Sequence, residues 1–270
     1  MKIGYMTNAF GPLVGSGGGV TSVKDIRYLT MGDDEDALRK ITEVGFHSIE
    51  VLEGNLTNYA DDPEVLKSML SRYGADMMSV CVGANFIYPD ALEDEMYHLE
   101  QVADMGQKIG LTYFVVCGGA IRGKGIQEGD VDLLAKGLDE LQKVTRRYGL
   151  TACFHPHLGS IAEKPAQIDE LFAKSDIPVC PDVAHLQAGG YDPVAFLEKY
   201  YDRIAFVHLK DWDGSSFVPM GCGQVDNDAV IRWLKAKGYD GDYLVECDGY
   251  PGDPVEACRI NYEFLKGKLI

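Results

Sequence analysis

The sequence is poor in the features that would assign a chain at once to several common classes of protein. No pair among its seven cysteines has CxxC spacing, so they are expected to be buried free thiols. No apolar run approaches the roughly 18 residues needed to span a bilayer. Residues 1–10 contain one lysine and no continuous apolar core, so no signal peptide is expected. Free thiols and the lack of a leader favour the reducing cytoplasm.

Positive charge is also scarce. The 270 residues include 25 Lys and Arg against 42 Asp and Glu, which gives a formal net charge of −17. So acidic a surface argues against nucleic acid or an anionic membrane as the main partner. We therefore expect a small-molecule partner, and any charge that binds an anion must be supplied locally by the site.

Strand-like and helix-like segments alternate along the whole chain. Helix starts are marked by Asp-Pro at residues 62, 192 and 253, which places a capping acceptor before a proline at the first helical position. The expected helices are 34–44, 63–73, 91–109, 131–148, 165–173, 193–200, 228–237 and 254–265. The expected strands are 2–7, 48–53, 77–82, 113–118, 151–157, 178–182, 204–210 and 243–247. Eight strand–helix units of roughly 34 residues each predict an α/β fold, the (β/α)8 TIM barrel, as one domain over residues 1–270.

A glycine-rich segment, 15–19, follows the first expected strand. It lacks the Gly-Lys-Ser/Thr sequence and the glycine spacing of phosphate-binding loops. We therefore interpret it as a mobile loop over the mouth of the barrel.

Polar side chains collect at the ends of the last four expected strands. The active site of a (β/α)8 barrel lies at the carboxyl ends of its strands, so residues that are distant in sequence should meet there. These residues are His155 and His157, Asp182 and His185, His208 and Lys210, and Glu246 and Asp248.

Four of these side chains form a candidate metal site. Two imidazoles and two carboxylates, His155, Asp182, His208 and Glu246, suit Mn²⁺, Co²⁺ or Zn²⁺ and leave positions for substrate oxygens. Each residue also has an ordinary structural alternative. Asp182 could cap a helix, Glu246 could pair with Lys210, and the histidines could be hydrogen-bonded at a strand end.

Four motifs at these strand ends carry a family resemblance. They are Phe-His-Pro-His-Leu-Gly-Ser at 154–160, Pro-Asp-Val-Ala-His-Leu at 181–186, Val-His-Leu-Lys-Asp at 207–211 and Leu-Val-Glu-Cys-Asp at 244–248. The chain resembles the xylose-isomerase-like barrels, also called sugar phosphate isomerases/epimerases, and among them the inosose (2-keto-myo-inositol) dehydratases. The resemblance implies one divalent cation, with Mn²⁺ favoured over Co²⁺ and Zn²⁺, at His155, Asp182, His208 and Glu246. It also implies that His185 contacts substrate hydroxyls. The histidine pair stands where many epimerases have a glutamate, which favours a dehydratase.

The resemblance implies a carbon–oxygen lyase that acts on a keto-cyclitol or keto-sugar, and the residues present suit that chemistry. A base removes the proton beside the carbonyl, and a group leaves from the next carbon, either water or the glycosidic group of a 3-keto-glycoside. We expect His157 to be the base or acid, Lys210 to polarise an oxygen or pair with Asp248, and His185 to orient the substrate. Trp212 could stack on a sugar ring or equally cover the rim of the barrel. Arg122, in the basic loop 122–125, could touch substrate oxygens, although a solvated flexible loop is the favoured interpretation of that segment.

Three other functions stay open at this point. A ketose epimerase or isomerase would use the same chemistry but return the proton. A non-catalytic sugar-binding barrel or assembly subunit would hold no transition metal. An endonuclease for abasic DNA shares the fold, but the net charge of −17 argues against it. Association into a homo-oligomer is compatible with the sequence, but no feature of the sequence fixes an interface.

Overall fold

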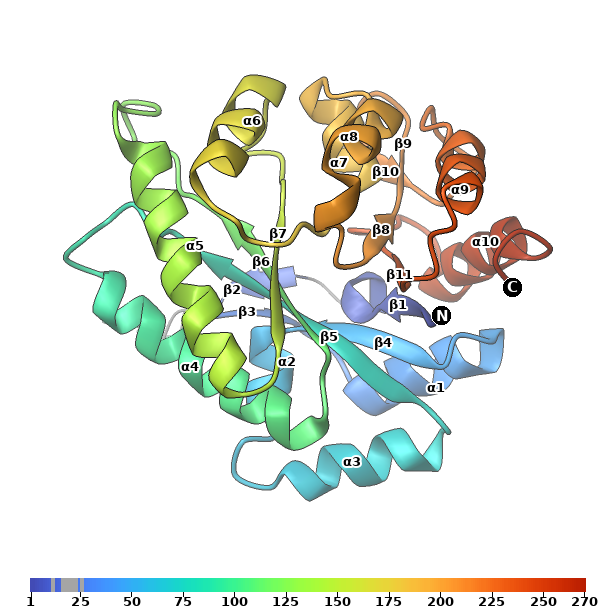
Figure 1. The fold of residues 1–270 in the computed structure, drawn as a ribbon. Coiled ribbons are helices and arrows are strands. Elements are labelled where there is room, and N and C mark those ends of the chain that lie inside the picture. The colour runs from blue at the N-terminus through green and yellow to red at the C-terminus, as the bar shows by residue number, and fades with distance from the viewer. Residues whose placement is uncertain (11–12, 16–23, 25–26) are drawn as a thin grey trace.

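The computed structural model describes residues 1–10, 13–15, 24 and 27–270, and it shows strands at the centre surrounded by helices (Figure 1). The central sheet is parallel, and its strand order is β7-β6-β5-β4-β1-β11-β8. Its strands are β1 (Ile3–Met6), β4 (Ser48–Leu52), β5 (Asp76–Ala84), β6 (Tyr113–Gly118), β7 (Thr151–His155), β8 (Val207–Leu209) and β11 (Tyr243–Val245). These strands coincide with seven of the eight expected ones, although several are shorter.

The eighth strand position is occupied by an irregular segment. Val179 forms isolated parallel bridges with Phe154 on one side and Ile204 on the other, and Asp182 bridges His208. The segment therefore lies between β7 and β8 and closes the curled sheet into a barrel. Pro178 and Pro181 interrupt it, and because proline has no N–H to donate, a continuous ladder cannot form. The expected strand at 178–182 is thus present in position but not as a regular strand.

The expected helices are all present, with ends within one residue of the prediction. They are α1 (Asp34–Val44), α3 (Pro63–Arg72), α4 (Leu92–Ile109), α5 (Asp130–Arg147), α6 (Pro165–Lys174), α8 (Pro193–Tyr200), α9 (Asn227–Ala236) and α10 (Pro254–Leu265). The side chains of Asp62, Asp192 and Asp253 accept backbone N–H groups at the starts of α3, α8 and α10. No helix in the described part of the chain is long and apolar enough to cross a membrane.

Several short elements were not expected from the sequence. They are the helices α2 (Glu53–Thr57) and α7 (Val183–Gly189), the 3-10 turns Thr7–Phe10 and Tyr201–Arg203, and the hairpins β2 (Leu13–Gly15) with β3 (Tyr28–Thr30) and β9 (Asp211–Trp212) with β10 (Phe217–Val218). Helices α2 and α7 and the β9–β10 hairpin follow strands at their carboxyl ends, so they surround the expected site. The glycine-rich segment proposed as a mouth loop lies, apart from Gly15, outside the described residues.

The barrel interior is apolar at one level and polar at the next. The apolar level contains buried side chains from strands all around the barrel, namely Met6, Leu52, Met78, Cys81, Val115, Cys153, Cys180, Phe206 and Leu244. Successive residues of a strand point to opposite faces, so the residue two positions later also points inward. In four of these segments that residue is His155, Asp182, His208 or Glu246. Because side chains alternate between the two faces of a strand, these four polar side chains point into the barrel interior at the carboxyl ends of the strands.

Candidate active site

The four residues of the expected metal site converge. One ligand atom from each of His155, Asp182, His208 and Glu246 can be chosen so that all four atoms lie within 4.8 Å of one another. His155 ends β7, Asp182 precedes α7, His208 lies within β8, and Glu246 follows β11. All four residues are buried. Residues up to 91 positions apart in sequence thus form one cluster of two imidazoles and two carboxylates.

Asp182 has two distinct carboxylate oxygens. Its Oδ1 accepts hydrogen bonds of 2.8 Å from the backbone N–H groups of Ala184 and His185, at the start of α7. Its Oδ2 has no hydrogen-bond partner among the described residues. The helix-capping alternative is therefore correct for one oxygen, while the other is free to serve as a ligand.

The cluster contains buried polar atoms that a cation would satisfy. Like Asp182 Oδ2, the Nδ1 atom of His155 has no hydrogen-bond partner within the described part of the chain. Leaving such atoms unpaired in a protein interior costs on the order of 1–3 kcal/mol each. The mixture of imidazole and carboxylate donors also suits a divalent transition ion. The residues present therefore fit the metal that the sequence suggests.

Lys210 supplies a positive charge beside the carboxylates. Its Nζ lies 2.6 Å from Asp248 Oδ2, 3.3 Å from Glu246 Oε1 and 3.8 Å from Asp182 Oδ2. Burial alone would lower the pKa of Lys210, but the three carboxylates together raise it above its ordinary value. The ammonium group therefore stays charged and partly balances the acidic cluster.

The three carboxyl groups beside Lys210 differ in the net direction of their pKa shifts. Burial raises the pKa of Asp182 to about 6 and that of Asp248 to about 7, against the opposing effect of Lys210. Burial would also raise the pKa of Glu246, but Lys210 and His208 hold it well below its ordinary value. Asp248 is therefore the carboxyl group closest to gaining and losing a proton near neutral pH.

The imidazoles of His155, His157 and His185 lie beside one another. Ring centroids are 5.6 Å apart for His155 and His157, 3.9 Å for His157 and His185, and 5.4 Å for His155 and His185. Burial lowers the pKa of all three, and the nearby positive charge of Lys210 acts in the same direction. They are therefore neutral at physiological pH, the form in which imidazole binds metals and accepts protons.

His157 has a defined tautomer. Strand β7 ends at His155, so His157 lies in the following turn, which Gly159 closes at a φ of 77°. The Nδ1 atom of His157 lies 2.7 Å from the carbonyl oxygen of Leu158. A carbonyl can only accept, so Nδ1 carries the hydrogen and Nε2 keeps the lone pair. His157 therefore lies beside His155, with ring centroids 5.6 Å apart, although it is not part of the strand.

A cavity of about 260 Å³ opens beside the cluster. Its polar wall consists of His155, His157, Glu246 and Asp248. The remaining wall is uncharged and is formed by Met6, Tyr28, Leu52, Cys81, Val82, Gly83 and Cys117. A substrate ring with polar groups on one side could place these groups against the polar wall and its carbon atoms against the uncharged wall.

Two further side chains lie directly behind the polar wall. The Nε2 atom of His185 is 3.1 Å from Lys210 Nζ, and neither residue lines the cavity itself. Phe217, on the β9–β10 hairpin, covers both, with its ring centroid 4.7 Å from the His185 ring and 4.2 Å from Lys210 Nζ. Two of the three predicted catalytic residues, His185 and Lys210, thus lie at the site but do not face the cavity, whereas His157 does.

The two possible substrate contacts, Arg122 and Trp212, have other partners in the structure. Arg122 pairs with the buried Asp130 at 2.9 Å, donates to the carbonyl of Ile87 at 2.6 Å, and stacks over Tyr88. Trp212, in β9, packs half-buried against the outer core. Neither residue lines the cavity beside the cluster.

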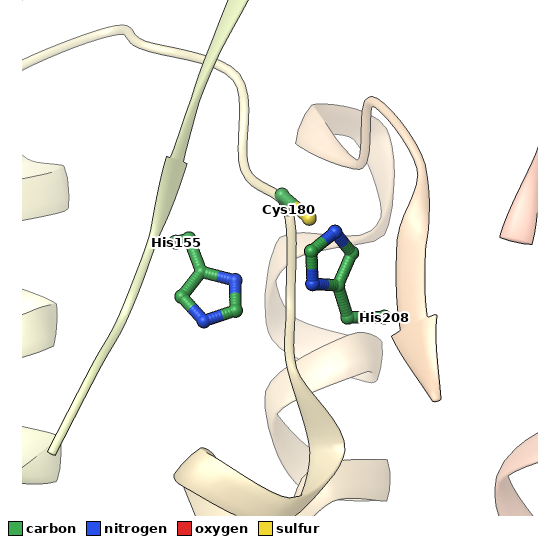
Figure 2. A group of neighbouring side chains, drawn as sticks. All are labelled: His155, Cys180 and His208. Atoms are coloured by element: carbon green, nitrogen blue, oxygen red, sulfur yellow. The ribbon is translucent and has the colours of Figure 1, made fainter. Parts of the chain in front are cut away.

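The structure also places residues at the site to which the sequence assigned no role. Figure 2 shows His155 and His208 on either side of the segment that carries Cys180, and these three residues also form a possible ligand group. Cys180 lies two positions before Asp182, among the buried apolar side chains of the barrel interior, and does not line the cavity. Glu50, in β4, faces His208 from across the barrel. The alternation of side chains along a strand could have predicted that Cys180 points inward like Asp182. No local sequence signal predicts that Glu50 faces His208.

Known proteins resemble this chain over most of its length. An inosose dehydratase of Geobacillus kaustophilus (strain HTA426) is 30% identical over 193 residues, which cover 66% of this chain and 61% of that protein, so the match spans less than two thirds of that relative. An inosose dehydratase of Clostridium beijerinckii (strain ATCC 51743 / NCIMB 8052) is 27% identical over 273 residues, 87% of this chain and 89% of that protein.

Solved structures agree with the fold. The 3-keto-D-glucoside 4-epimerase YcjR from E. coli, in its apo form, has a TM-score of 0.77 at 20% identity, covering 99% of both chains. The IolI protein with a bound zinc atom has a TM-score of 0.75 at 17% identity, covering 98% of this chain and 97% of that one. At such identities the likeness concerns the fold. A family model described as "Xylose isomerase-like TIM barrel" matches residues 38–268. The chain belongs to the xylose isomerase-like TIM barrel family.

Proposed function

We propose that this protein is a divalent-metal-dependent lyase that acts on a keto-cyclitol or keto-sugar by abstraction of an α-proton and β-elimination. The observation that carries the proposal is the convergence of His155, Asp182, His208 and Glu246 beside a cavity that His157 also lines. The inosose dehydratases among its relatives support this substrate class. We propose these four residues as the ligands of one cation, with Mn²⁺ as the first candidate and Co²⁺ and Zn²⁺ as alternatives.

A bound divalent cation would supply Lewis-acid polarisation of a substrate carbonyl and an adjacent hydroxyl, which acidifies the neighbouring C–H. The protein itself must then accept the proton. His157 is suited to this role because it is neutral, its Nδ1–H is engaged by Leu158, and its Nε2 keeps a lone pair at the cavity wall. We therefore propose His157 as the general base.

Departure of a hydroxyl group requires a proton on the leaving oxygen. Asp248 lines the cavity, and burial raises its pKa to about 7, so a substantial fraction of it is protonated at neutral pH. We propose Asp248 as the acid. Lys210 lies behind Asp248 at 2.6 Å and would set the charge of this carboxyl rather than touch substrate. His185 would similarly support the ring of His157, which lies 3.9 Å from its own.

The cavity wall supports an uncharged substrate. No lysine or arginine is among the described residues that line it. Arg122 is engaged by Asp130, and Lys210 by carboxylates. A phosphate ester would therefore meet carboxylates and apolar carbon without a compensating cation. A neutral ketone that carries hydroxyls fits better.

The alternative is an epimerase or isomerase that uses the same residues. His157 and Asp248 both face the cavity, so a proton taken by one could be returned by the other without loss of a group. Elimination and epimerisation therefore differ in the fate of the leaving oxygen, which an experiment can follow directly.

The test uses purified protein that has been stripped with a chelator and then supplied with Mn²⁺, Co²⁺ or Zn²⁺. It is incubated in D₂O with 2-keto-myo-inositol and, separately, with a 3-keto-glucoside. We expect a new enone absorbance that depends on the added metal. Deuterium in recovered substrate without enone would favour epimerisation, and neither signal with any metal would contradict both enzymatic proposals.

We further propose that the protein works in the cytoplasm. All seven cysteines are free thiols, including the partly exposed Cys117 and the exposed Cys222, which suits a reducing compartment.

A further inference from the structure

Glu50 is a buried carboxyl group that no hydrogen bond accounts for. It lies in β4, is fully buried, and neither of its carboxyl oxygens has a hydrogen-bond partner among the residues that the structure describes. A carboxyl group in such a position is costly unless a partner compensates it. Its presence in the barrel interior therefore calls for a specific partner.

Glu53, three residues later, shows what a structural glutamate at this strand end looks like. It is equally buried, but its Oε1 accepts a hydrogen bond of 2.8 Å from the backbone N–H of Tyr28 and so ties β3 to α2. Glu50 makes no comparable side-chain contact with the backbone in the described region. The two neighbouring glutamates thus have different surroundings.

The side chain that Glu50 faces is His208. Its Oε2 lies 3.6 Å from Nε2 of His208, an imidazole nitrogen that itself has no hydrogen-bond partner within the described residues. The other nitrogen of the same ring, Nδ1, lies 3.1 Å from Glu246 Oε2, inside the four-residue cluster. The ring is therefore held between two carboxyl groups, with one nitrogen facing the cluster and the other facing Glu50.

We propose that Glu50 is the positioning residue of the metal site: it accepts a hydrogen bond from Nε2–H of His208 and so presents the lone pair of Nδ1 to the cation. The inference rests on the metal site of the proposed function. A ligating histidine commonly donates its second ring N–H to a carboxylate, which fixes both tautomer and ring orientation. A small movement of either side chain shortens 3.6 Å to hydrogen-bond length.

Glu50 acts through His208 and not as a ligand itself. The group of atoms within 4.8 Å of one another comprises His155, Asp182, His208 and Glu246, and does not include Glu50. Removal of the Glu50 carboxyl should therefore weaken the site without emptying it.

The first test compares E50Q with wild type and with the matched control E53Q, all as full-length protein. Mn²⁺ affinity is measured by calorimetry after far-UV circular dichroism has shown that each variant is folded. Loss of a carboxylate that orients a ligand typically costs 10–100-fold in metal affinity, so we expect a loss of about tenfold or more in E50Q and less than about twofold in E53Q. An E50Q protein that binds Mn²⁺ as tightly as wild type would overturn the inference but not the metal site. A wild-type protein that binds no metal would overturn both.

The second test needs no variant, so it decides the case even if E50Q does not fold. Zn²⁺-loaded wild type with ¹⁵N-labelled histidine is examined by long-range ¹H–¹⁵N NMR. We expect His208 to show a protonated Nε2 and a metal-bound Nδ1. A His208 that binds zinc through Nε2, or whose Nε2 carries no proton, would contradict the role of Glu50.

Discussion

Replacement of Lys210 by methionine should reveal how strongly the acidic cluster depends on this one cation. The ammonium is fully buried and faces Asp248, Glu246 and Asp182 at 2.6, 3.3 and 3.8 Å. Methionine fills a similar volume but has no charge. The variant therefore removes the attraction while it leaves the packing of the barrel nearly intact.

The magnitude follows from these distances. At an effective dielectric constant of about 20, the three attractions amount to roughly 6, 5 and 4 kcal/mol, and most of this sum is offset by the desolvation of the charges. Removal of one partner from a buried ion pair typically costs 3–5 kcal/mol. We therefore expect the K210M protein to lose about 4 kcal/mol of unfolding free energy when it is free of metal. Added Mn²⁺ should recover part of this loss, since its charge replaces that of the lysine.

The assay is urea unfolding followed by circular dichroism, with and without Mn²⁺. The matched control is K108M, because Lys108 pairs with Asp104 at a similar distance, 2.6 Å, but on an exposed helix surface. An exposed pair of this kind contributes only about 0.3–0.5 kcal/mol. A metal-free K210M protein whose unfolding free energy lies within about 1 kcal/mol of the wild-type value would show that Lys210 does not stabilise the acidic cluster.

Three further predictions concern single residues. The H157A variant should retain Mn²⁺ affinity but lose about 10²–10⁴-fold in kcat, because it lacks the proposed base; an unchanged kcat would exclude that role. Burial raises the pKa of Glu53 to about 8 from 4.5, so its ionisation destabilises the folded state increasingly as pH rises from 4.5 and fully above 8. E53Q should therefore gain stability relative to wild type between pH 5 and 9, by up to about 4–5 kcal/mol, and an equal pH dependence of the two proteins in urea unfolding would contradict this. The R122A variant should have a KM within about twofold of the wild-type value, because Arg122 pairs with Asp130 and does not line the cavity. A large rise in KM would instead indicate that Arg122 contacts the substrate.

The helices and the four-residue cluster were predictable because their signals are local. An aspartate before a proline marks a helix start wherever it occurs, and the side chains of Asp62, Asp192 and Asp253 do cap their helices. The inward-facing residues at the strand ends were also predictable, because side chains two positions apart on a strand point to the same face. Barrel closure then brings these strand ends together.

Other features depend on contacts that no local pattern encodes. The role of Glu50 arises from a contact across the barrel interior, which depends on strand tilt and closure. The irregular segment at 178–182 follows from its two prolines, a signal present in the sequence but not used in the prediction of a strand there. Arg122 was considered as a substrate contact, yet it pairs with Asp130, the first residue of α5, a contact that no local pattern indicates.

The proposed chemistry depends on one cation held by His155, Asp182, His208 and Glu246. The most direct measurement is anomalous X-ray diffraction at the manganese edge from crystals of the full-length protein soaked in Mn²⁺. We expect a single strong peak within bonding distance of those four side chains. No peak there, or a peak at another position such as the deeper group that includes Cys180, would contradict it.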